Sequence, residues 1–120
     1  MTADEFRAIA LSFPLSEEAG HMGHPDFRVQ GRIFATLGYP NSGWGVVKLT
    51  PVQQAAFVLA EPRAFRPVNG AWGRRGSTGV ILRAVTQAAA CEALLEAWRN
   101  RAPKRLVRAT ALRGTERSTG

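Results

Sequence analysis

The chain is poor in the residues that carry metal and covalent chemistry. It has one cysteine, Cys91, and two histidines, His21 and His24, among 120 residues. A single cysteine excludes an internal disulfide, and no Cys/His cluster has the spacing of a structural zinc site. His21, His24 and Asp26 lie close enough in sequence for a metal site or a general base, but such a group is more often a capped loop. We therefore expect no metal, no cofactor and no catalytic residue.

Long apolar runs are also missing. No stretch approaches the length that spans a membrane, and the first five residues are acidic where an export signal would be basic. These features predict a cytoplasmic protein. A chain of 120 residues with 45% hydrophobic content is large enough for one domain with a core of its own.

Acidic residues are scarce towards the C-terminus. The net charge is +7, of which residues 99–120 carry +6 and residues 1–98 only +1. We therefore divide the chain into a nearly neutral domain, residues 1–103, and a basic, flexible tail, residues 104–120, that holds Lys104, Arg105 and Arg108. Such a tail attracts polyanions without reading sequence. The alternatives are a solubilising extension, or a short helix through Leu106, Val107 and Leu112.

Apolar spacing and capping signals predict an α+β fold. Residues 2–5 fit a capping box before a helix that ends at Pro14, and residues 50–53 fit another before a helix closed by Glu61 and Pro62. Strands are expected on both sides of Gln30 and Gly31, at 44–49, at 66–68 and at 78–85, with an acidic turn at 16–18. Because hairpin connections dominate this order, we predict an antiparallel sheet with helices packed on one face.

A last helix is predicted to end at Ala102 and Pro103. It carries an apolar stripe at positions i, i+3, i+4 and i+7, formed by Cys91, Leu94, Leu95 and Trp98. This spacing places Cys91 on the apolar face. We therefore expect Cys91 to be a buried, unreactive small hydrophobe.

The segment GAWGRRGST at residues 70–78 is the most distinctive part of the sequence. Glycines let the backbone approach another molecule closely, and Arg74 and Arg75 among them can meet phosphate or carboxylate groups, with Trp72 as a stacking face. The alternative is a β-hairpin tip with solvated arginines and a core tryptophan. The glycine spacing is not that of a phosphate-binding loop between strand and helix.

Four short motifs follow one another along the chain: HPDFR at residues 24–28, GRIFA at 31–35, Lys48-Leu49, and GAWGR at 70–74. Together they resemble the MmcQ/YjbR family, small bacterial proteins described as DNA-binding through a double wing. The resemblance runs from about Phe6 to Pro103. It implies a CyaY-like α+β fold whose wings are the hairpin at Gln30 and Gly31 and the loop at 73–76.

A basic sheet face is expected beside these wings. Period-two alternation predicts that Arg28, Arg32 and Lys48 lie on the face not covered by helices, with Arg83 as a further candidate. We predict a non-enzymatic protein that contacts the phosphates of double-stranded DNA with weak sequence specificity, through Arg74, Arg75, Trp72, Lys48, Arg28, Arg32, Lys104, Arg105 and Arg108. The alternative is a protein- or small-ligand-binding domain with an incidental tail.

Overall fold

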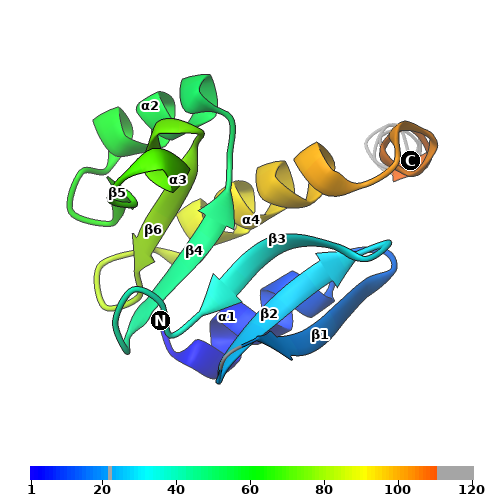
Figure 1. Ribbon diagram of the computed structural model, residues 1–120, viewed down its shortest axis with the longest axis horizontal. Helices are drawn as coiled ribbons and strands as arrows, with labels where there is room; N and C mark the ends of the chain where they lie inside the picture. The colour runs from blue at the N-terminus through cyan, green and yellow to red at the C-terminus, as the bar shows by residue number, and fades with distance from the viewer. Residues whose placement is uncertain (22, 111–120) are drawn as a thin grey trace.

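The structure is a computed structural model that describes residues 1–21 and 23–110, without the side chain of His21. Six strands form one antiparallel sheet in the order β1-β2-β3-β4-β6-β5 (Figure 1). The strands are β1 (Ser16–His21), β2 (His24–Val29), β3 (Arg32–Leu37), β4 (Trp44–Lys48), β5 (Phe65–Pro67) and β6 (Ser77–Ile81). The helices are α1 (Ala3–Leu11), α2 (Pro51–Ala60), α3 (Ala71–Arg74) and α4 (Gln87–Arg101), and residues 104–110 are also helical. The predicted α+β fold is confirmed.

The core lies between the sheet and helices α1 and α4, which cover one of its faces (Figure 1). Phe6 of α1 and Trp98 of α4 are fully buried against Phe27 and Phe34 of the sheet. The opposite face carries no long helix in the described part of the chain, and only the one-turn helix α3 stands beside it. Among the same residues, no helix combines the length and apolar character needed to cross a bilayer.

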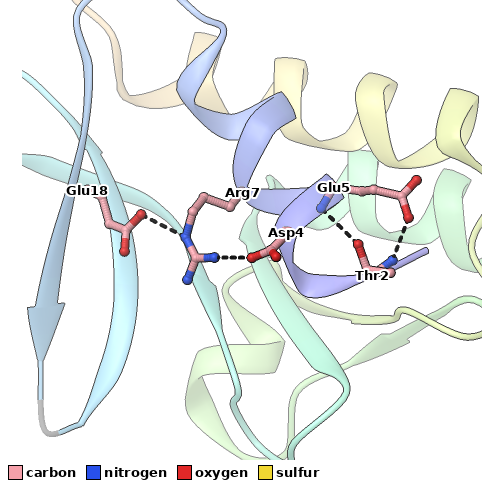
Figure 2. Close-up of polar contacts among 5 residues, drawn as sticks. All are labelled: Thr2, Asp4, Glu5, Arg7 and Glu18. Carbon is pink, nitrogen blue, oxygen red and sulfur yellow. Dashed lines mark hydrogen bonds and ion pairs between the residues drawn. The ribbon is translucent and has the colours of Figure 1, made fainter.

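Both predicted capping boxes form, at Thr2 and at Thr50. The Thr2 hydroxyl accepts from the backbone N–H of Glu5, and the Glu5 carboxylate accepts from the N–H of Thr2 (Figure 2). These reciprocal bonds satisfy amides that have no partner inside the helix, and they lower the pKa of Glu5. The local sequence therefore fixes where α1 and α2 begin.

The acidic turn expected at residues 16–18 is wrong, because these residues begin strand β1. Glu18 lies opposite Phe27 in the β1-β2 ladder, and its carboxylate accepts from Arg7 of α1 over 2.9 Å (Figure 2). Arg7 also pairs with Asp4 over 2.6 Å. The strand was missed because an edge strand made of Ser, Glu, Ala and Gly has no apolar alternation.

The β2-β3 hairpin corrects the predicted face of Arg32. Gln30 and Gly31 have φ angles of 51° and 78°, as a tight two-residue turn requires, and Val29 pairs directly with Arg32. Because Val29 faces the core, Arg32 projects to the helix side, and Ile33 takes the place opposite Arg28. Arg83 lies in a turn after β6 and is not part of the sheet.

Cys91 is exposed, so its predicted burial is wrong. The buried face of α4 is centred on Ala90, Ala93, Leu94 and Ala97, together with Trp98. The small alanine side chains let this face of the helix lie close to the sheet. Cys91 lies outside this face.

Candidate nucleic-acid interface

The segment at residues 70–76 is docked on the domain and does not extend as a hairpin tip. It forms helix α3 between β5 and β6. Gly73 and Gly76 are buried, and a Cβ at these positions would overlap the backbone carbonyl oxygens of Val68 and Leu49. The glycines are therefore required for close backbone packing. This docking fixes where the neighbouring side chains of Trp72, Arg74 and Arg75 emerge.

Trp72 is 59% exposed, which corrects the alternative of a core tryptophan. The Lys48 Nζ atom lies 4.8 Å from the centre of its ring, and the Arg75 guanidinium carbon lies 5.9 Å from it. Both distances are within the range of cation–π attraction. Trp72 thus brings a cation of β4 together with Arg75, the residue that caps the C-terminal end of α3, on one indole.

Lys48 is half-buried and has no carboxylate within ion-pair distance in the described part of the chain. Its ammonium donates to the Ser77 hydroxyl over 3.2 Å. Burial lowers the pKa of Lys48, and the positive charge of Arg101 lowers it further. A half-buried cation near another cation is a natural binding point for an anion.

Arg101, in the last turn of α4, was missed as a site residue. A cation there is expected from the helix dipole alone, so the sequence gives no separate signal for it. Its pKa is lowered by burial and by the charge of Arg32, whose guanidinium donates to the Arg101 carbonyl over 3.3 Å. We call Arg32, Lys48, Trp72, Arg74, Arg75 and Arg101 the basic strip.

The strip forms where β3 and β4 separate. These strands pair only from Ala35 to Leu37 and from Gly45 to Val47, so the carbonyl of Lys48 has no partner in β3. The side chain of Asn100 donates to that carbonyl over 3.0 Å. The C-terminal end of α4, and with it Arg101, is thereby held near Lys48.

Arg28 lies on the open sheet face as predicted, but it is already paired. Its guanidinium donates to both carboxylate oxygens of Asp26, over 2.8 and 3.1 Å, which raises the pKa of Arg28. Asp26 is fully buried, so the arginine neutralises a carboxylate that is removed from water. Arg28 is therefore not a free cation of the strip.

A cavity of about 540 Å³ lies on the open face of the sheet beside the strip. Ile33, Val46 and Val68 supply its apolar surface. Its other lining residues are His24, Asp26, Thr36, Tyr39, Lys48, Trp72 and Ser77. The cavity and the strip share two residues, Lys48 and Trp72.

Comparison with known proteins identifies the family. The chain matches the YjbR family over residues 11–100. It belongs to the YjbR family. A solved structure, the Deinococcus radiodurans protein DR2400 with family-model domain DUF419, superposes on this YjbR chain with a TM-score of 0.68 at 19% identity; the match covers 81% of this chain and 75% of that one. The likeness shows the fold, and no curated protein matches the chain.

The predicted tail of this YjbR chain begins as a helix at residues 104–110. Leu106 and Val107 pack against the core, and Arg105 lies in a shallow depression with Gln30 of the β2-β3 turn. Leu112 and the residues around it lie outside the described part. Lys104, Arg105 and Arg108 thus belong to a helical segment that follows α4 in the chain.

The pair of histidines yields no assigned site. Within residues 1–21 and 23–110, no group of three or more His, Cys, Asp or Glu side chains lies together as metal ligands would. The side chain of His21 is outside the described part. His24 packs edge-on against Tyr39, with 6.1 Å between the ring centres.

Proposed function

We propose that this YjbR-family protein binds nucleic acid, chiefly through phosphates on the basic strip. The supporting observation is that cations from β3, β4, α3 and α4 come together. Among the described residues, none of these cations has an acidic side chain within 4.0 Å. The lowered pKa values of Lys48 and Arg101 mean that the folded protein disfavours the charged forms of these side chains. Binding of a polyanion stabilises the charged forms.

The geometry also suits a backbone more than a single small ion. Arg74 and Arg75 are exposed at the C-terminal end of α3, whereas Lys48 is half-buried beneath Trp72. Lys104, Arg105 and Arg108 continue the positive charge beyond Arg101. Spaced cations of this kind contact successive phosphates and carry little sequence information.

The test is the double variant Arg74→Ala/Arg75→Ala, with Arg63→Ala/Arg83→Ala as its matched control. The control pair is also exposed, but it lies near the other end of β6. Affinity for a duplex is measured by fluorescence anisotropy over a series of salt concentrations. We expect at least a tenfold loss for the first pair only, with the slope of log K against log salt reduced by about 0.9 for each phosphate that is no longer neutralised. Equal affinity for the two folded variants would overturn the proposal.

A further inference from the structure

Phosphate binding by the basic strip does not account for the apolar and aromatic lining of the cavity on the open sheet face. Its apolar wall is formed by side chains from three elements, with Ile33 on β3, Val46 on β4 and Val68 after β5. Tyr39 and Trp72 are 45% and 59% exposed although each lines the cavity. Large aromatic surface left open beside an apolar hollow favours a flat aromatic ring as the occupant.

Polar groups beside the apolar wall suit a ring with hydrogen-bonding edges. The Thr36 hydroxyl lies on the same face as Asp26 and Val46, with which it pairs across the sheet. Ser77 contributes a second hydroxyl, which accepts from Lys48. Convergent polar groups beside an apolar surface are typical of a ligand site.

The cationic side chains lie at one edge of the cavity, whereas the Asp26 carboxylate that also lines it is bound by Arg28. Lys48 lines it, and Arg75 stands over the ring of Trp72. An occupant with an aromatic ring at one end, hydrogen-bonding groups on the ring edge and an anion at the other end matches this arrangement. A nucleotide is such a molecule.

We propose that the cavity receives the unpaired base of a single nucleotide, with its phosphate bound by Lys48 and Arg75. This inference rests on the proposed function, in which the basic strip binds the neighbouring phosphates. The preferred ligand is then an unpaired nucleotide, either free or within a single strand. A paired base is stacked inside a duplex and does not reach the cavity.

Four probes at matched salt test the proposal: a short thymidine oligomer, an abasic oligomer of the same length, thymidine 5′-monophosphate, and ribose 5-phosphate as the base-free control of the monophosphate. Stacking of one base contributes about 1 to 3 kcal/mol, so we expect the thymidine oligomer to bind at least about fivefold more tightly than the abasic one. Binding of the monophosphate but not of ribose 5-phosphate would assign the same site to a free nucleotide. Equal affinity for the thymidine and abasic oligomers would overturn the base site while leaving phosphate binding intact.

The variant Thr36→Phe fills the cavity and leaves every cation in place. Its control is Leu59→Phe, which adds an aromatic ring at a side chain that is 85% exposed on α2. We expect Thr36→Phe to bind the thymidine oligomer only as tightly as the abasic one, whereas Leu59→Phe keeps the difference. Unchanged discrimination in a folded Thr36→Phe variant would overturn the proposal.

A measurement on the parent chain covers the case in which Thr36→Phe does not fold. Amide and indole resonances of Tyr39, Thr36 and Trp72 are followed by NMR during titration with each oligomer. We expect Thr36 and Tyr39 to shift with the thymidine oligomer and not with the abasic one. Identical shifts with both would refute a base in the cavity, and absence of binding by both would count against the proposed function itself.

Discussion

The side-chain amide of Asn100 donates to the backbone carbonyl of Lys48 over 3.0 Å, joining the end of α4 to the end of β4. The same amide donates to Gln53 of α2 over 2.8 Å. One side chain thus connects three elements at the point where β3 and β4 separate. The position of Arg101 beside Lys48, and therefore the basic strip, depends on this contact.

Asn100→Ala should lower stability because it leaves the partly buried Lys48 carbonyl without its side-chain donor and removes one of the two hydrogen bonds that the Gln53 side-chain oxygen accepts. We expect a loss of about 1 to 3 kcal/mol in the free energy of unfolding, measured by urea denaturation. Asn69→Ala, at an exposed asparagine, is the matched control and should change stability by less than about 0.5 kcal/mol. Similar stability for both variants would contradict the role of Asn100.

Gly73→Ala should be far more damaging than its size suggests, because the new methyl group would overlap the carbonyl oxygen of Val68. We expect a loss of roughly 3 kcal/mol or more, or displacement of α3 together with weaker nucleic-acid binding. Gly20→Ala is the control, since a Cβ there would lie 4.0 Å from its nearest neighbour, the His24 carbonyl oxygen. The midpoints of thermal unfolding of the two variants are compared. Equal midpoints would show that α3 is not docked as described.

Cys91 should react quickly with a thiol reagent in native buffer, because its side chain is exposed on α4. Comparing the labelling rate before and after denaturation tests this, and a rate that rises strongly on unfolding would indicate burial. Cys91→Ser should change the free energy of unfolding by no more than about 0.5 kcal/mol, as expected for a surface position.

Lys48 should titrate below its ordinary value of 10.5, because burial and Arg101 disfavour its charge. Its charge therefore reduces stability at neutral pH, and this reduction disappears as the pH rises through the folded pKa towards 10.5. The chain has only one other lysine, Lys104, so the Lys48 side chain can be followed by NMR with little overlap. Bound phosphates should raise the pKa of Lys48, and titration of Lys48 at or above 10.5 in the free protein would contradict the argument.

Neutralising the terminal cations should weaken binding without unfolding the chain. Replacing Lys104, Arg105 and Arg108 by glutamine keeps Leu106 and Val107 on the core, whereas truncation after Pro103 removes that packing. We expect the substituted chain to retain its stability while its salt slope falls by about 0.9 for each phosphate that these cations neutralise in the parent. A slope equal to that of the parent would exclude these residues from the interface.

Much of the fold follows from local sequence signals. Thr2 with Glu5 and Thr50 with Gln53 set the starts of two helices, and Gln30 with Gly31 sets a tight hairpin. These signals act over a few residues, so they are readable without the rest of the chain. Strand β1 was not predicted because its residues gain their partners only from β2 and from Arg7 of α1.

The candidate site was predictable in its parts but not in its assembly. The glycine-rich segment with Trp72, Arg74 and Arg75 and the concentration of cations near the C-terminus are visible in the sequence. The approach of Arg101 to Lys48, the burial of the Asp26 carboxylate that Arg28 neutralises, and the exposure of Cys91 emerge only when the chain is folded. Burial and the approach of Arg101 to Lys48 depend on which faces pack together and on side chains distant in sequence, which local patterns do not encode.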